Sequence, residues 1–130
     1  MHVLVVDDNP DAVEILSLLL QGWGHDVRTA SSGPQAIEEV QTYHPEVVLM
    51  DIGLPGMDGY QVAQRMRTEA SAKQPVLVAL TGYGEDEDYR RSREAGFDHH
   101  LLKPVSSVLL QRLLARVSDH YSRACSQIGP

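Results

Sequence analysis

Five apolar runs of strand length, each followed by a helix signal, constrain this chain most. The runs occupy residues 2–6, 25–30, 46–51, 76–81 and 99–103. The first and fourth are continuously apolar rather than alternating, which is typical of parallel strands covered on both faces. Five strand–helix repeats predict an α/β domain with a mostly parallel sheet and right-handed crossover connections.

Helix signals follow each run. Asn9 can cap the first helix, with Pro10 at its first position. The helix expected at residues 85–95 is unusual because it carries very little apolar stripe. Its acids fill the first turn and its arginines the later turns, which matches the helix dipole. We expect this helix to be held only lightly to the core.

Length and composition narrow the class of protein. At 130 residues we expect one domain over residues 1–121 and a C-terminal tail over residues 122–130. The net charge of −7 disfavours direct nucleic-acid binding. A single cysteine excludes an internal disulfide framework and fits a reducing compartment. No apolar run approaches the roughly 20 residues of a membrane span and no cleavable signal is evident, so we expect a cytoplasmic module without membrane contact.

Polar side chains end four of the expected strands. They are Asp7, Asp8, Asp51, Thr81 and Lys103. If the first, third, fourth and fifth strands are neighbours, these side chains converge on one edge of the sheet. Three clustered carboxylates need a cation, and hard oxygen ligands suit Mg²⁺. A lysine and a threonine hydroxyl suit an arriving phosphoryl group, so the pattern indicates phosphoryl transfer to an aspartate.

Each of these residues also has an ordinary structural interpretation. An aspartate after a strand is a common turn or capping residue, Thr81 before Gly82 fits a turn, and Lys103 fits a solvated strand end. What favours the functional interpretation is that all of them fall at carboxyl strand ends.

Four motifs together resemble the receiver domain of two-component response regulators. They are Asp7–Asp8 after an apolar strand, the segment 51–59, Ala79–Leu80–Thr81–Gly82, and Lys103–Pro104. The resemblance covers about residues 2–121. It implies a flavodoxin-like (βα)5 fold, a doubly wound five-stranded parallel sheet in strand order 2-1-3-4-5. The residues of these motifs look most like those of receivers attached to hybrid sensor histidine kinases.

The resemblance also implies a metal site and a phosphorylation site. Asp51 would be the phosphoacceptor. Asp8, Asp51 and the backbone carbonyl of Gly53 would ligate Mg²⁺ directly, and Asp7 would act largely through water.

A switch is implied at the neighbouring strands. Lys103 would pair with Asp51 or its phosphate, Thr81 would swing its hydroxyl to the phosphate, and the Lys103–Pro104 peptide would be cis. Receivers often have Tyr or Phe three positions before the lysine, where this chain has His100. The histidine can fill the space behind Thr81, and a partly exposed edge-strand histidine is an equally good interpretation.

By this resemblance, the chain accepts phosphoryl from a histidine kinase or a histidine phosphotransfer protein. It would catalyse its own phosphorylation and dephosphorylation without a separate substrate. It would switch the surface of its fourth helix, fifth strand and fifth helix, which is also the family's usual homodimer surface. Two rivals remain. A haloacid-dehalogenase-like phosphohydrolase would carry Asp-x-Asp rather than adjacent aspartates, and a phosphorylation-independent pseudo-receiver usually lacks an acidic-site residue.

Overall fold

The structure is a computed structural model that describes residues 1–54, 56, 58–69, 74–82 and 86–128, excluding the side chains of 69, 86–89 and 119–128. Its elements, in chain order, are β1 (His2–Val6), α1 (Pro10–Gly22), β2 (Asp26–Ala30), α2 (Gly33–Tyr43), β3 (Val47–Asp51), α3 (Gly59–Glu69), β4 (Val76–Thr81), α4 (Asp86–Ala95), β5 (His99–Leu102) and α5 (Ser107–Ile128). The strands form one parallel sheet in the order β2-β1-β3-β4-β5. The predicted doubly wound, flavodoxin-like fold is therefore confirmed.

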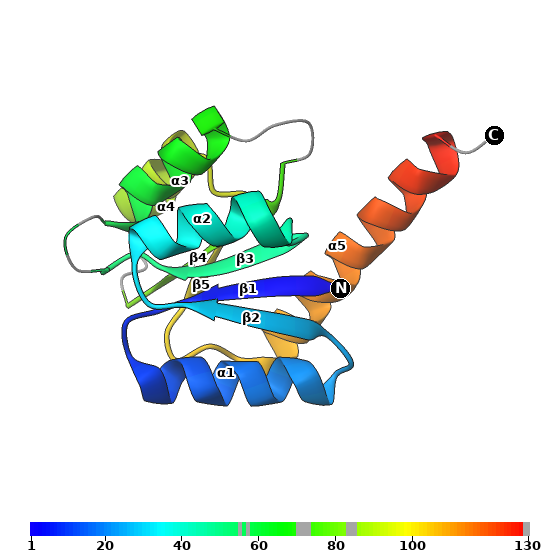
Figure 1. Cartoon of the computed structure of the whole chain (residues 1–130), viewed down its shortest axis with the longest axis horizontal. Helices are drawn as coiled ribbons and strands as arrows, with labels where there is room; N and C mark the ends of the chain where they lie inside the picture. Colours follow the sequence, from blue (N-terminus) through cyan, green and yellow to red (C-terminus); the bar gives the residue numbers. More distant parts are fainter. Residues whose placement is uncertain (55, 57, 70–73, 83–85, 129–130) are drawn as a thin grey trace.

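Helices cover both faces of the sheet. In Figure 1, α2, α3 and α4 lie on one face and α1 and α5 on the other. Alternate residues of a single strand serve the two layers: Leu4 and Val6 pack under α2 and α3, whereas Val3 and Val5 pack under α1 and α5. All four are fully buried, which explains why the strand is continuously apolar.

Side-chain caps begin the helices where the sequence indicates. Asn9 Oδ1 accepts hydrogen bonds from the backbone N–H groups of Asp11 and Ala12, at 3.0 and 3.5 Å. At the start of α3, Gln61 N–H donates to Asp58 Oδ1 at 2.9 Å, and Asp58 N–H donates to Gln61 Oε1 at 3.2 Å. This reciprocal pair is a capping box. It fixes where α3 begins and hence the length of the loop after β3.

Arg67, on α3, fastens the edge of the sheet opposite the carboxyl strand ends. Its guanidinium donates to the carbonyl of Gly96 at 2.9 and 2.7 Å and to the carbonyl of Pro75 at 2.9 Å. It also binds Asp98 Oδ2 at 2.7 Å, and Asp98 Oδ2 in turn accepts from Leu77 N–H at 2.9 Å. One side chain thus ties α3 to the start of β4 and to the connection between α4 and β5.

The last helix is longer than we expected from the sequence. α5 continues to Ile128, so most of residues 122–130, expected to be a tail, are helical. Figure 1 shows this part of α5 projecting away from the body of the domain. The domain boundary at residue 121 stays a prediction. Within the part of the chain that the structure describes, no helix combines the length and the apolar character needed to cross a membrane.

Candidate functional site

The strand-end residues do converge. β1, β3, β4 and β5 are neighbours, and all strands run the same way, so their carboxyl ends share one edge of the sheet (Figure 1). Asp51 and Thr81 are the last residues of β3 and β4, while Asp7 and Lys103 directly follow β1 and β5. Lys103 N–H donates to the carbonyl of Thr81 at 2.7 Å, which holds the two strand ends together.

Three carboxylates form an acidic cluster. One oxygen from each of Asp7, Asp8 and Asp51 lies within 4.8 Å of the others. The Asp7 side chain is 3% exposed and that of Asp51 15%, whereas Asp8 is open to solvent. The Oδ1 atoms of Asp7 and Asp51 each accept a backbone hydrogen bond at 3.0 Å, from Asn9 N–H and Gly53 N–H respectively. These bonds orient the two carboxylates, and the Oδ2 atom of each faces Lys103 Nζ.

Lys103 neutralises part of this charge. Its Nζ lies 3.3 Å from Asp7 Oδ2 and 3.3 Å from Asp51 Oδ2. Burial lowers the pKa of Lys103, but the carboxylates of Asp51 and Asp7 raise that pKa by more, so it stands above its ordinary value. The ammonium group is therefore charged throughout the physiological range, and it faces both carboxylates from one position.

The loop after β3 folds back tightly on that strand. Gly59 N–H donates to the carbonyl of Ile52 at 2.8 Å. A Cβ at Gly59 would lie 2.7 Å from the Cα of Ile52, so the backbone can approach only because residue 59 has no side chain. Leu54 anchors the loop in the core, with 5% of its surface exposed. These contacts hold Gly53 beside Asp51. The need for a glycine at position 59 was not predicted from the sequence. The only indication was that a glycine stands where a helix was expected to start.

The donor set fits a hard divalent cation. Mg²⁺ prefers carboxylate and carbonyl oxygens with several waters, and it is usually held by one or two carboxylates. Asp8 and Asp51 each offer a carboxylate oxygen to the cluster, and Gly53, with its backbone carbonyl, follows Asp51 by two residues. The cluster therefore has the chemistry of a magnesium site.

The expected switch residues lie on one face of β4 and β5. Thr81 is buried, with 6% of its surface exposed. In the register of the two strands, Ala79 is paired with His100 and Thr81 with Leu102. Because Ala79 and Thr81 are two residues apart, His100 and Thr81 lie on the same face of the sheet. His100 Nδ1 lies 2.9 Å from the hydroxyl of Ser92 in α4, a contact that the sequence did not predict. The Lys103–Pro104 peptide bond is cis.

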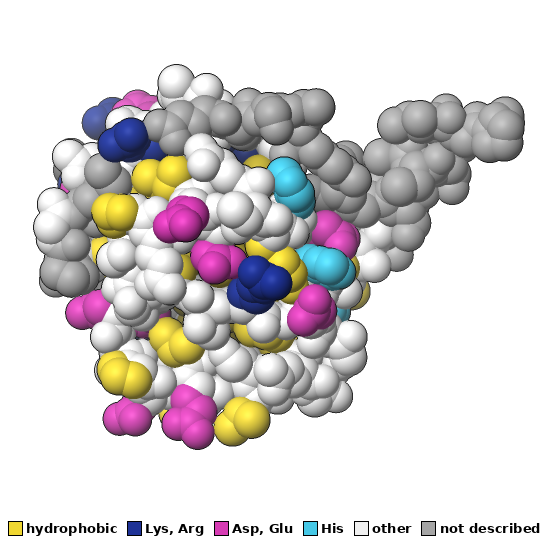
Figure 2. Space-filling view, viewed as in Figure 1, with side chains coloured by type: hydrophobic (Ala, Val, Ile, Leu, Met, Phe, Trp, Pro, Cys, Tyr) yellow, Lys and Arg dark blue, Asp and Glu magenta, His cyan; other side chains and the backbone are white. Residues whose placement is uncertain are grey.

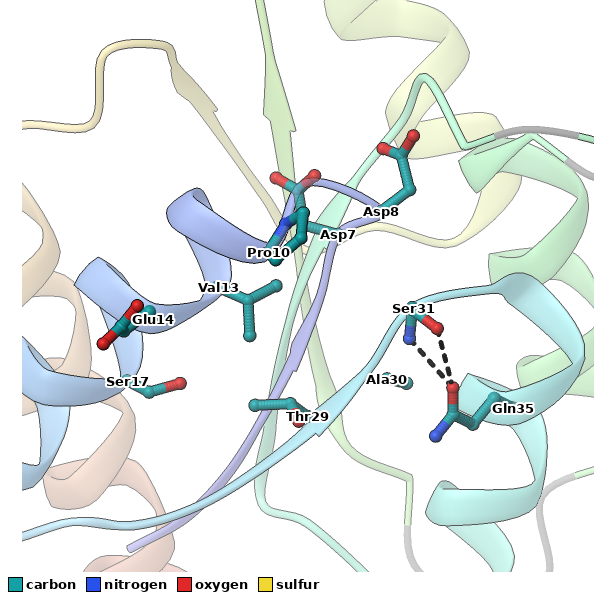
Figure 3. A pocket seen from close by; sticks show the side chains of 10 residues that line it. All are labelled: Asp7, Asp8, Pro10, Val13, Glu14, Ser17, Thr29, Ala30, Ser31 and Gln35. Atoms are coloured by element: carbon teal, nitrogen blue, oxygen red, sulfur yellow. Dashed lines mark hydrogen bonds between the residues drawn. The ribbon is translucent and has the colours of Figure 1, made fainter.

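A cleft of about 400 Å³ opens beside the acidic cluster, between α1, the end of β2 and the start of α2. Asp7, Asp8, Val13 and Thr29 are among the residues that line it. Figure 3 shows the Ser17 side chain reaching into this space. Its buried hydroxyl has no hydrogen-bond partner among the described residues. No motif in the sequence indicated this cleft.

The face of the molecule that contains β2 is mainly acidic, as the net charge of the chain would suggest. Figure 2 shows the face formed by β2 and its neighbours, with acidic side chains spread across it and few basic ones between them. Arg28, from β2, is engaged locally: it lies 4.6 Å from the ring centroid of Tyr43 and 3.5 Å from Glu39 Oε2. This face therefore offers no continuous basic surface among its described side chains, in keeping with the net charge of −7.

The fold and the site define a flavodoxin-like domain with an acidic cluster at the carboxyl edge of its sheet. The sequence matches the response regulator receiver domain family over residues 3–116. The chain therefore belongs to this family, as the motifs predicted. The phosphorylation-independent alternative is not favoured, since Asp7, Asp8 and Asp51 are all present in the acidic cluster. The hydrolase alternative is not favoured either, because Asp7 and Asp8 are adjacent and Asp51 ends β3.

Individual relatives agree with the family assignment. The DNA-binding response regulator MtrA of Mycolicibacterium smegmatis is 35% identical over 122 residues, covering 94% of this chain and 51% of MtrA. The chain thus spans about half the length of that relative. A 14.6 kDa protein from the sodA1 3′ region of Leptolyngbya boryana is 32% identical, with 88% and 87% covered. The chemotaxis response regulator CheY4 of Vibrio cholerae superposes with a TM-score of 0.82 at 28% identity, covering 89% and 97%.

Proposed function

We propose that Asp51 accepts a phosphoryl group from a histidine kinase or a histidine phosphotransfer protein. The observation that carries this proposal is the position of Lys103, whose Nζ lies 3.3 Å from both Asp51 and Asp7. An ammonium group shared by two carboxylates can stay in place and bind the phosphoryl oxygens as charge develops on them. A lysine that served only to stabilise the fold would not need to face the exposed edge of the cluster.

The reaction transfers one phosphoryl group from a histidine nitrogen to an Asp51 oxygen. An oxygen of the Asp51 carboxylate forms a bond to phosphorus while the bond from phosphorus to the donor histidine nitrogen breaks, and that nitrogen keeps the electron pair. Lys103 stabilises the charge on the phosphoryl oxygens. Gly53 N–H continues to bind Asp51 Oδ1, which leaves Oδ2 as the attacking oxygen.

A magnesium ion belongs to this proposal. Asp8, Asp51 and the carbonyl of Gly53 would hold the ion directly, and buried Asp7 would act largely through water. When bound, Mg²⁺ neutralises the charge that accumulates between the carboxylates and the phosphoryl oxygens. The close approach of Gly59 to Ile52 keeps the Gly53 loop in position for this role.

Phosphorylation would be communicated through Thr81 and His100 to the surface of α4, β5 and α5. Thr81 would turn its hydroxyl to the phosphate and vacate space on the face that it shares with His100. That surface includes three exposed apolar side chains, which supports its use as a docking or homodimer surface. They are Leu102, Val108 and Leu109, which are 46%, 55% and 53% exposed.

The cellular setting follows from the same proposal. A receiver that takes phosphoryl from kinase domains would work in the cytoplasm, as the composition also indicated. The functional unit would be residues 1–121, within which the family match of residues 3–116 falls. The chain would catalyse its own phosphorylation and dephosphorylation and turn over no other substrate.

Intact mass tests the proposal. After incubation with acetyl phosphate and Mg²⁺, we expect a single phosphoryl adduct. The adduct should be absent in Asp51→Asn and in a sample treated with EDTA. An Asp58→Asn variant is the matched control, because Asp58 caps α3 and lies outside the acidic cluster. An adduct that survives in Asp51→Asn would show that the phosphoacceptor is a different residue.

A further inference from the structure

Polar contacts account for much of the attachment of residues 90–95 of α4 to the rest of the domain. Among residues 90–95, the part of α4 whose side chains are described, only Ser92 and Ala95 are buried. Arg91 lies over the ring of Tyr60 in α3, with 4.5 Å between the guanidinium carbon and the ring centroid. With so little buried apolar surface among residues 90–95, this part of α4 depends strongly on each specific contact that it makes.

The hydrogen bond between Ser92 and His100 is the most buried of these polar contacts. The oxygen of Ser92 lies 2.9 Å from His100 Nδ1, and Ser92 is 1% exposed. A hydroxyl at that depth is costly to leave without a partner. The contact also joins two elements, because Ser92 belongs to α4 and His100 to β5.

The same imidazole ring lies next to the phosphorylation switch. His100 is paired with Ala79, whose small side chain leaves room above the strand, and Thr81 follows on the same face. Lys103 follows three positions after His100 and binds the phosphoacceptor Asp51. His100 therefore lies between the residues of the proposed switch on β4 and its partner Ser92 on α4.

We propose that Ser92 is a positioning residue of this switch: its hydroxyl holds the His100 ring, and through the ring α4, in the unphosphorylated arrangement. This inference rests on the proposed function of Asp51 as phosphoacceptor. When Thr81 turns to the phosphate, His100 moves into the vacated space and its bond to Ser92 is lost. α4 is then released from β5.

The coupling has a measurable consequence. If the bond between Ser92 and His100 exists only in the unphosphorylated arrangement, removing it shifts the equilibrium toward the arrangement that favours phosphorylation. A buried neutral hydrogen bond corresponds to a change of about 2- to 10-fold in such an equilibrium. We therefore expect Ser92→Ala to be phosphorylated by acetyl phosphate about 2- to 10-fold faster than the wild type.

Four variants frame the rate measurement. Ser92→Thr keeps a hydroxyl at this position and should stay close to the wild-type rate. Ser118→Ala removes an exposed helical serine from α5 and should change nothing. His100→Phe removes the other partner and should accelerate phosphorylation to a similar extent. The double variant Ser92→Ala/His100→Phe should show no further gain, because both changes remove the same bond. If Ser92→Ala folds poorly, His100→Phe alone tests the same bond from its other partner.

Nuclear magnetic resonance supplies a second readout, and its response to phosphorylation is one that a purely structural bond would not show. The ring nitrogens of ¹⁵N-labelled histidines report tautomer and hydrogen bonding, and His100→Phe assigns the His100 signals. We expect the Nδ1 signal of His100 to shift in Ser92→Ala, to be retained in Ser92→Thr, and to change in the wild type on phosphorylation.

The outcomes separate this inference from the proposed function. A His100 signal that is identical in Ser92→Ala and the wild type, or equal phosphorylation rates, would overturn the role of Ser92 while leaving Asp51 as phosphoacceptor. A wild-type protein that takes up no phosphoryl group overturns the proposed function and the coupling with it. In that case the resonance experiment still reports whether Ser92 holds the ring.

Discussion

Replacing Arg67 by alanine should destabilise the domain, because this side chain ties α3 to the start of β4 and to the connection between α4 and β5. The variant leaves the carbonyls of Gly96 and Pro75 without their donor, and a buried unsatisfied group costs about 1–3 kcal/mol. The Arg67 side chain is 24% exposed, so water compensates in part. The ion pair with Asp98, which is 45% exposed, adds only about 0–1 kcal/mol. We expect the free energy of unfolding to fall by about 2–4 kcal/mol.

Urea denaturation followed by far-ultraviolet circular dichroism measures this loss. Arg67→Lys should recover less than half of it, since one ammonium cannot match the fixed fork that reaches several acceptors. Arg112→Ala, which removes an exposed arginine from α5, should stay within about 0.5 kcal/mol of the wild type. A loss for Arg67→Ala as small as that for Arg112→Ala would refute the argument that this side chain holds three segments together.

Two further predictions concern the loop after β3 and the pH dependence of stability. Gly59→Ala should destabilise by about 1–3 kcal/mol, because its Cβ would lie 2.7 Å from the Cα of Ile52, whereas Gly53→Ala should be tolerated, with its nearest contact at 3.7 Å. Equal urea midpoints for the two variants would contradict this. Burial and the neighbouring Met1 ammonium lower the pKa of His25 from its ordinary value of 6.5, so the unfolded chain takes up this proton at higher pH than the folded one. The contribution of His25 to stability is therefore complete above pH 6.5 and falls as the pH drops through that value. His25→Gln lacks this pH-dependent contribution, so its urea midpoint should fall less than that of the wild type between about pH 7.5 and about pH 5.5. Equal falls in the two proteins would refute the lowered pKa of His25.

The sequence predicted what its local patterns encode. Continuous apolar runs indicated buried parallel strands, and Asn9 indicated where α1 begins. The strand order came from the family resemblance, because periodicity carries no information about which strands are neighbours. The strand ends then followed from topology, since parallel strands bring their carboxyl ends to one edge.

Contacts between distant residues were beyond the reach of local patterns. Arg67 resembles any basic residue in the last turn of a helix, and nothing near it in the sequence identifies Gly96 or Asp98 as its partners. The bond between Ser92 and His100 depends in the same way on how α4 lies over β5. The helical segment beyond residue 121 was also missed, because we expected a tail there.

The position of the Arg67 contacts has a mechanical consequence. They fix the carbonyl of Gly96, directly after the C-terminal end of α4, to α3 and to the start of β4. The other end of α4 begins near the carboxyl edge of the sheet, where phosphorylation would act. If one end of a helix is fixed and the other end is displaced, the helix rotates about its fixed end. Because Arg67 fixes the C-terminal end of α4, a small displacement beside Thr81 would change the tilt of the whole helix and of its outer surface.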